Sequence, residues 1–300
     1  MLYICPTPIG NLADVTLRVL DVLRRVDLVA CEDTRRTRVL LDRHGITART
    51  ISFHGHNEEL RVALLLPRLR AGEEIALVSD AGMPGLSDPG FSLVRACVSE
   101  NLPVTVLPGP SAVSTALVVS GLPVDDFAFI GFLERGAAKL VEQLARFEAT
   151  GAAVVAFESP RRVRASLAAI GERWPDRLLA LCRELTKIHE EVVRGTAAEI
   201  LDRLMDPVRG EIVLVLAPSG VVPQRGRGCA SGSGYPGVPL AVDAVEHRAR
   251  VALADLVQLG IGMKKAARIV AGLTGLPARR AYELGLEGRH EQVDDGEDPV

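Results

Sequence analysis

Short aliphatic runs that alternate with helical patterns constrain the fold of this chain more than any other sequence feature. Strands are predicted over residues 2–5, 27–31, 50–53, 75–78 and 104–107, and helices over residues 15–23, 34–44, 57–70 and 91–99. Asp14 and Asn57 stand at the start of two of these helices, and we expect them to be the N-caps. Strands that alternate with helices join into a mainly parallel sheet covered on both faces, so the pattern predicts an α/β fold.

A second α/β pattern begins after Pro108-Gly109-Pro110. Its predicted strands are residues 127–132, 154–157, 178–182, 190–194 and 212–216, and its predicted helices include residues 111–120, 139–147 and 197–204. A further helix follows Glu158, with Ser159 as the expected N-cap and Pro160 as the expected first residue. We therefore assign residues 1–110 to an N-terminal α/β domain and residues 111–218 to a C-terminal one.

The composition of the chain changes after residue 218. Residues 219–239 are rich in Gly, Pro and Ser, which predicts a flexible linker. Three helical patterns within residues 240–286 predict a small helical appendage. Residues 287–300 carry six acidic residues against one arginine and predict an acidic, disordered tail. Because the whole chain has a formal net charge of −3, the folded body without this tail is expected to be slightly basic.

Cysteine usage and hydropathy indicate a cytoplasmic protein. The five cysteines are widely spaced and form no C-x-x-C pair, which argues against disulfides and structural zinc. No secretory signal pattern is seen. Residues 101–124 carry no charge, but prolines and glycines interrupt them, so we expect a strand, a loop and a buried helix and no membrane span. His54 and His56 lack a third ligand nearby, and helix capping by the adjacent Asn57 is a better explanation than a metal site.

The loop at residues 79–90 is the strongest candidate for a ligand contact. It follows the predicted strand at residues 75–78 and contains three glycines, two prolines and two aspartates. Ligands of open α/β sheets bind beyond the carboxyl ends of strands, so a ligand loop is favoured over an elaborate turn. The loop after the first strand, residues 6–11, lacks both G-x-G-x-x-G and a Walker lysine, which disfavours an ordinary dinucleotide or nucleotide triphosphate site.

Charged residues also gather after three other predicted strands. Glu32 and Asp33 precede two arginines, although Asp33 has an alternative role as a helix N-cap. Glu158 and the arginines that follow it occupy the equivalent place in the second domain, where a solvated helix face is the alternative. Residues 183–191 form the densest run of ionisable groups and are predicted to be either a hairpin tip or the rim of a site.

Several motifs occur in order along the chain: residues 6–14 (PTPIGNLAD), 32–35 (EDTR), 79–82 (SDAG), 88–90 (DPG), 108–112 (PGPSA), 131–133 (GFL), 158–160 (ESP), 183–187 (RELTK) and 210–211 (GE). With these motifs the chain resembles the ribosomal small subunit methyltransferase I family, the 16S rRNA (cytidine-2′-O)-methyltransferases of the tetrapyrrole methylase superfamily. The resemblance extends from residue 2 to about residue 215 and resumes at residues 263–267.

This resemblance implies a fold of two α/β domains that hold S-adenosylmethionine in the cleft between them, and a homodimer. It implies methyl transfer, without a metal, to the ribose 2′-hydroxyl of a decoding-centre cytidine in 16S rRNA or the small ribosomal subunit. The residues expected at the cofactor are Pro8, Ile9, Gly10, Asp80, Ala81, Gly82, Met83, Ser111, Ala112 and Glu158. Met83 stands where the family usually has threonine, so a backbone contact is expected there in place of a hydroxyl contact.

A ribose hydroxyl is a weak acid, so a general base, or a lysine that stabilises the alkoxide, would assist such a transfer. By position and residue type, the candidates for these roles are Glu32, Asp33, Glu184 and Lys187. The candidates for holding RNA phosphates are Arg35, Arg161 and Arg183, together with Lys264 and Lys265 of the appendage.

Two other functions are compatible with the sequence. One is a methylase of the same superfamily that acts on a tetrapyrrole-like small molecule or on a protein, because the cofactor loops are shared. The other is a non-catalytic, RNA-binding ribosome assembly factor. The basic motifs and the helical appendage favour an RNA substrate, and labelled methyl transfer distinguishes the three functions.

Overall fold

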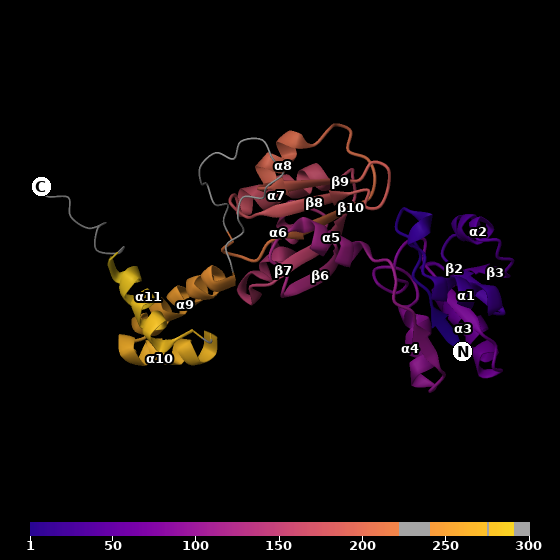
Figure 1. The fold of residues 1–300 in the computed structure, drawn as a ribbon, viewed down its shortest axis with the longest axis horizontal. Coiled ribbons are helices and arrows are strands. Elements are labelled where there is room, and N and C mark those ends of the chain that lie inside the picture. Colours follow the sequence, from indigo (N-terminus) through magenta and orange to yellow (C-terminus); the bar gives the residue numbers. More distant parts are fainter. Residues whose placement is uncertain (222–240, 275, 291–300) are drawn as a thin grey trace, which may run out of the picture.

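The computed structural model describes residues 1–221, 241–274 and 276–290, which form two α/β domains followed by a helical region (Figure 1). The first sheet has the strand order β3-β2-β4-β1-β5, and all of its strand pairs are parallel. Its strands are β1 (Leu2–Ile4), β2 (Leu28–Cys31), β3 (Thr50–Ser52), β4 (Ile75–Val78) and β5 (Val104–Val106). Its helices are α1 (Leu17–Arg25), α2 (Thr34–Arg43), α3 (Glu58–Arg70) and α4 (Phe91–Ser99), with a 3-10 turn η1 (Leu12–Asp14).

Helices cover both faces of the first sheet, as the alternating pattern predicts. One core joins α1 and α2 to one set of strand residues, and a second core joins α3 and α4 to the alternate set. In β4, for example, Ala76 and Val78 belong to the first core, whereas Ile75 and Leu77 belong to the second. Successive side chains of a strand point to opposite faces, so a strand buried on both sides is apolar at every position.

The second sheet is mixed, with the strand order β6-β7-β10-β8-β9. Only β6 and β7 pair in parallel, and the other neighbours are antiparallel. Its strands are β6 (Phe127–Phe132), β7 (Ala153–Glu158), β8 (Leu179–Arg183), β9 (Glu191–Gly195) and β10 (Ile212–Leu216). Its helices are α5 (Ala112–Ser120), α6 (Ala137–Ala145), α7 (Val163–Arg173) and α8 (Ala197–Arg203), with a 3-10 turn η2 (Glu148–Thr150). The predicted pairing of the strands on either side of residues 184–190 is confirmed as the β8–β9 hairpin.

A first-domain residue completes one core of the second domain. Ile9, from the loop after β1, is 7% exposed and packs in the core that α5 forms with β8 and β10. Val113 of α5 and Leu185 of the β8–β9 loop belong to the same core. Burying this side chain stabilises the contact between the domains by roughly 1.5–3 kcal/mol.

Two predicted helix starts, those of α1 and α7, are wrong, and the predicted start of α3 is right. Asp14 belongs to η1, and the N-cap of α1 is Thr16, whose Oγ1 accepts a hydrogen bond from the Val19 N–H at 3.2 Å. Asn57 occupies the N-cap position of α3 as predicted, but its Oδ1 accepts a hydrogen bond from the His54 N–H and forms no capping bond to α3. Helix α7 begins at Val163, because residues 159–162 form a turn after the buried end of β7.

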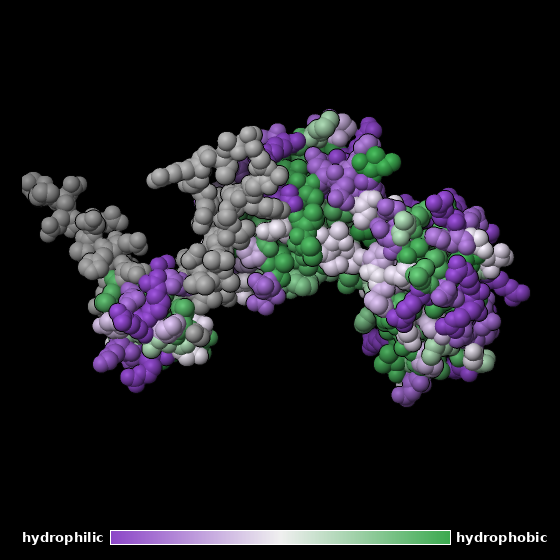
Figure 2. All heavy atoms as spheres, in the orientation of Figure 1, coloured by the Kyte–Doolittle hydropathy of each residue, from purple (hydrophilic) through white to green (hydrophobic). Residues whose placement is uncertain are grey.

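The helical region consists of α9 (Ala241–Gln258), α10 (Met263–Thr274) and α11 (Ala278–His290) around an apolar core of their own. The face seen in Figure 2 is mainly hydrophilic over the first domain and over this region. Within the described ranges, no helix is long and apolar enough to cross a membrane. Most of the predicted linker and the last ten residues of the predicted acidic tail lie outside the described residues. Four cysteines, Cys5, Cys31, Cys97 and Cys182, are buried and free, and Cys229 also lies outside.

Replacing Glu58 by Ala should destabilise the loop that leads into α4. The Glu58 Oε1 accepts hydrogen bonds from the backbone N–H groups of Gly90, at 3.0 Å, and Ser92, at 3.4 Å. We expect a loss of about 1–2 kcal/mol in the free energy of unfolding in urea, as for loss of a helix cap. Glu59→Ala, at an exposed residue of the same helical turn, is the matched control. Equal losses in the two variants would contradict this role of Glu58.

Candidate functional site

A cavity of about 430 Å³ lies between the two α/β domains. We call it the interdomain cavity. The first domain lines it with Ile9, Glu32, Arg36, Asp80, Ala81, Gly82, Met83, Leu86, Ser87 and Asp88. The second domain lines it with Ser111, Ala112, Val113, Phe132, Phe157, Glu158, Ser159, Pro160, Gly210, Glu211, Ile212 and Val213. The cavity thus has apolar walls and several carboxylates, and its volume is in the range of small-molecule sites.

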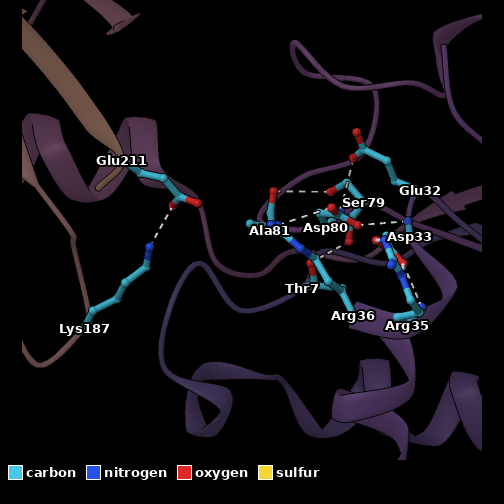
Figure 3. A network of polar contacts seen from close by, with 10 residues as sticks. All are labelled: Thr7, Glu32, Asp33, Arg35, Arg36, Ser79, Asp80, Ala81, Lys187 and Glu211. Atoms are coloured by element: carbon cyan, nitrogen blue, oxygen red, sulfur yellow. Dashed lines mark hydrogen bonds and ion pairs between the residues drawn. The ribbon is translucent and has the colours of Figure 1, made fainter. Parts of the chain in front are cut away.

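Hydrogen bonds between two strand-end loops hold the first-domain wall. Thr7, after β1, and Gly82, after β4, exchange two backbone N–H···O=C bonds of 2.9 Å each. The Thr7 hydroxyl donates to the Ser79 carbonyl at 3.0 Å, and Figure 3 shows this pair beside Asp80. Gly82 adopts a φ of +77°, which favours glycine because a side chain is strained there. These hydrogen bonds therefore hold the candidate ligand loop, residues 79–90, against the loop that follows the neighbouring strand β1.

Asp80 links this loop to the end of β2. Its Oδ1 accepts a hydrogen bond from the Asp33 N–H at 3.0 Å, and its Oδ2 lies 3.3 Å from the Arg36 Nη1. Its own N–H donates to the Glu32 carboxylate at 3.4 Å. Figure 3 shows these groups together on the first-domain side. The motif after β2 and the loop after β4 thus form one polar cluster at the cavity.

Most of the residues predicted at the cofactor line the interdomain cavity. Ile9, Asp80, Ala81, Gly82, Met83, Ser111, Ala112 and Glu158 do so, whereas Pro8 and Gly10 do not. Pro8 is buried. Met83 also packs against the α3–α4 core of the first domain. Its thioether therefore stabilises the domain as well as bordering the cavity.

The buried Glu158 side chain holds the turn that follows β7. The residue is 2% exposed, and its carboxylate forms an ion pair with Arg162 at 2.6 Å. It also accepts hydrogen bonds from the Ser159 N–H and the Ser166 hydroxyl. A buried carboxylate needs such partners. Because its oxygens are already engaged, Glu158 positions the turn that borders the cavity.

Two of the predicted bases are ionised too strongly to be good proton acceptors. Hydrogen bonds from Arg35 hold the pKa of Asp33 well below its usual range, and Asp33 does not line the cavity. The hydrogen bond from Lys187 lowers the pKa of Glu184, whose Oε1 also accepts the Glu211 N–H at 2.9 Å. A carboxylate stabilised in its charged form has less tendency to take a proton.

Lys187 is held at the edge of the interdomain cavity by two carboxylates. Its Nζ lies 3.2 Å from Glu211 Oε2 (Figure 3) and 2.8 Å from Glu184 Oε1. Glu211 lines the cavity. Burial acts to lower the pKa of Lys187, but the hydrogen bond to Glu184 and the charge of Glu211 outweigh it and raise the pKa. Lys187 therefore remains a cation at neutral pH.

Gly10 allows the lysine stem to lie against the first domain. A Cβ on Gly10 would lie 2.4 Å from the Lys187 Cγ and 2.9 Å from the Leu185 carbonyl oxygen. The neighbouring Asn11 N–H donates to the Thr186 Oγ1 at 3.1 Å. The predicted cofactor residue Gly10 thus lies in the contact between the loop after β1 and the β8–β9 loop.

Asp88 is a cavity residue that the sequence reasoning did not select. Burial and the nearby charge of Glu32 raise its pKa to about 6, although a hydrogen bond with Ser79 acts in the opposite direction. The available sequence signal was its place in the loop at residues 79–90, but its burial arises from the fold. A carboxylate with this pKa is ionised at neutral pH and yet basic enough to accept a proton.

The structure separates the arginines predicted to hold RNA. Arg35 pairs with Asp33 at 2.7 Å and Arg183 pairs with Glu191 at 2.8 Å. Arg161 lines an open hollow of about 790 Å³ beside the interdomain cavity, with which it shares Phe132 and Ser159. Arg135, Lys139 and Arg162 also line this Arg161 hollow. Lys264 and Lys265 are exposed on α10.

No group of three or more His, Cys, Asp or Glu residues among the described parts of the chain is arranged to hold a metal ion. The ring of His54 lies edge-on to that of His56, with centroids 6.1 Å apart, and its Nε2 is 3.1 Å from the Asn57 amide nitrogen.

Comparison with known proteins defines the class. The sequence profile of the tetrapyrrole (corrin/porphyrin) methylases matches residues 1–201. The fold is similar to that of the methyltransferase CobJ, with a TM-score of 0.57 and 18% identity over 76% of this chain and 96% of that one. It is also similar to uroporphyrin-III C-methyl transferase from Thermus thermophilus complexed with S-adenyl homocysteine, with a TM-score of 0.51 and 18% identity over 72% and 96% of the chains. The protein therefore has the two-domain fold of a tetrapyrrole methylase, which confirms the predicted fold class.

A curated relative narrows this assignment. The ribosomal RNA small subunit methyltransferase I of Synechocystis is 40% identical over 292 residues, which cover 96% of this chain and 98% of the relative. The chain belongs to the ribosomal RNA small subunit methyltransferase I family of tetrapyrrole methylases. The resemblance seen in the sequence motifs is thus confirmed.

Replacing Asp88 by Asn should stabilise the fold at alkaline pH. Because the folded pKa is raised, Asp88 contributes stability below pH 4 that is lost as the pH rises through about 6. For a fully buried group, a pKa shift of this size changes the free energy of unfolding by about 3 kcal/mol. Because Asp88 is partly exposed, we expect a change of about 1 kcal/mol. We expect Asp88→Asn to gain that amount relative to the wild type between pH 4 and pH 8 in urea unfolding. A difference that does not change with pH would contradict the raised pKa.

Proposed function

We propose that this protein transfers a methyl group from S-adenosylmethionine to the ribose 2′-hydroxyl of a decoding-centre cytidine in 16S rRNA. The observation that carries this proposal is the interdomain cavity, whose edge is formed by the Lys187–Glu211 ion pair. The name of the Synechocystis relative supports small-subunit rRNA as the substrate class. We infer that the homodimer implied by the family resemblance and the cytoplasmic location indicated by the cysteine usage also apply, and sedimentation and fractionation test them.

The residues of the cavity fit S-adenosylmethionine. Phe132, Phe157 and Val213 offer apolar surface for an adenosyl group, while the loop at Asp80 and Gly82 offers carboxylate and backbone groups to a cationic methionyl part. When bound, this cofactor supplies a methyl group on a sulfonium, whose leaving group is a neutral thioether. Alignment of the acceptor is then the main task of the protein.

The chain's own residues would handle the proton of the acceptor hydroxyl. The transfer forms one O–C bond, breaks one S–C bond and releases the hydroxyl proton. We assign Asp88, with Glu32 beside it, as the acceptor of this proton, because both line the cavity. Lys187 remains charged and would stabilise the developing oxyanion from the second-domain side. Asp33 and Glu184 then act as positioning residues, through Arg35 and Lys187 respectively.

A basic surface that suits an extended anion lies next to the interdomain cavity. Arg135, Lys139 and Arg161 surround the Arg161 hollow, which adjoins the cavity at Phe132 and Ser159. Their charges suit the phosphates of an RNA strand. This favours RNA over a tetrapyrrole-like small molecule. The exposed lysines of α10 are a second candidate surface for RNA.

The direct test is to incubate the protein with labelled S-adenosylmethionine and small ribosomal subunits that lack the modification, and then to map the labelled nucleotide. We expect label on a ribose 2′-oxygen of a decoding-centre cytidine. Label on a base or a protein, or only on an added tetrapyrrole, would contradict the proposal. RNA binding without any transferred label would indicate an assembly factor.

Replacing Lys187 by Ala should lower kcat by about 10²-fold or more, the loss typical of removing an oxyanion donor. The Kd of S-adenosylmethionine should change little, because Lys187 does not line the interdomain cavity. Lys139→Ala, which removes a lysine from the Arg161 hollow, is a matched control that should raise KM and spare kcat. Turnover of Lys187→Ala close to the wild-type value would remove Lys187 from the proposed mechanism.

A further inference from the structure

A second open hollow is lined by Lys187. It has a volume of about 820 Å³ and is lined from both domains: by the loop at residues 10–13, by Arg43 and His44 at the end of α2, and by residues 186–189 of the β8–β9 loop. We call it the Lys187 hollow. Lys187 lines it, and its partner Glu211 lines the cavity, so the Lys187–Glu211 ion pair of 3.2 Å joins the linings of the two spaces.

The chemistry of the Lys187 hollow suits an anion. Its lining residues include Arg43, Lys187 and two histidines and contain no carboxylate. Lys187 already has two carboxylate partners, whereas Arg43 is exposed and forms no ion pair in the part of the chain that the structure describes. The Nε2 of His44 is buried without a hydrogen-bond partner among the same described residues. A bound group that carries negatively charged oxygen atoms could pair with the exposed Arg43 side chain.

The β8–β9 loop presents an apolar side chain at this hollow. Ile188 is 98% exposed, although the residues around it are held by hydrogen bonds. The Lys187 N–H donates to the Glu184 carbonyl at 3.0 Å, and the Thr186 N–H donates to Glu190 at 2.6 Å. Glu184 and Thr186 adopt left-handed φ values of +51° and +66°, which are strained for residues other than glycine. The fold thus maintains a strained loop that places an isoleucine in solvent.

We propose that the Lys187 hollow binds the nucleotide next to the methylated ribose, with Arg43 on its phosphate and Ile188 against its base. A single RNA strand offers a phosphate and an apolar base face at each nucleotide, and the hollow offers a cation and an apolar side chain. The strand would then pass Lys187 and place the neighbouring ribose in the interdomain cavity. This inference deepens the proposed function and rests on it.

The test compares the methylation kinetics of Arg43→Gln, Ile188→Ser and Arg38→Gln on small ribosomal subunits that lack the modification. Arg38 is exposed on the same helix as Arg43 but lines neither space, so it controls for the loss of one positive charge. We expect Arg43→Gln to raise KM about tenfold and to reduce the slope of log KM against log salt by about 1. Ile188→Ser should raise KM about fivefold without changing the slope.

Control measurements distinguish the possible outcomes. Arg38→Gln should change KM less than twofold, and Arg43→Lys should retain the salt slope of the wild type. All variants should bind S-adenosylmethionine with the wild-type Kd, which also verifies that they are folded.

If Arg43→Gln and Ile188→Ser behave like Arg38→Gln, the inference is overturned. A change in the sedimentation mass of Arg43→Gln would instead identify the hollow as a contact between copies of this chain and would also overturn it. Failure of the proposed function is distinguishable, because the wild type itself would then place no label on the RNA.

Discussion

The contact between the loops after β1 and β4 is the interaction on which the site depends. The two backbone hydrogen bonds between Thr7 and Gly82 join these loops, and Ile9, two residues further on, enters the core of the second domain. The same segment therefore shapes the cavity wall and holds the domains together. Because β1 and β4 are parallel neighbours in the sheet, their carboxyl ends lie side by side and this contact is possible.

The charges of the site are divided between the two domains. On the first-domain side Asp80 contacts Glu32 and Arg36, and on the second-domain side Glu211 pairs with Lys187 (Figure 3). Two of the charged groups close to the cavity, Asp33 and Glu184, are neutralised by basic partners, which leaves Asp88 as the carboxylate with a raised pKa. Acidic groups in different surroundings can thus have different roles within one site.

Most of the fold could be predicted from local patterns, and the errors have local causes. The spans of α4, β6 and β10 match the predicted residues because clear breaks border each apolar run. The start of α7 was predicted too early, since the Ser159-Pro160 pair is a common helix start. In the structure the buried Glu158 accepts a hydrogen bond from the Ser159 N–H and pairs with Arg162, and a turn forms where the helix start was predicted. That competition depends on burial, which the local pattern does not report.

The sequence by itself determined the alternating α/β architecture, the family and the loops that border the site, because periodicity and motif order are local properties of the chain. Only the tertiary structure decided which residues of those loops face the interdomain cavity. It brought Lys187 to Glu211, buried Asp88 and placed Arg43 and Ile188 in the lining of one hollow, although the members of each pair are far apart in sequence. The physical reason is that ionisation and binding depend on neighbours in space, and sheet order and domain packing select those neighbours.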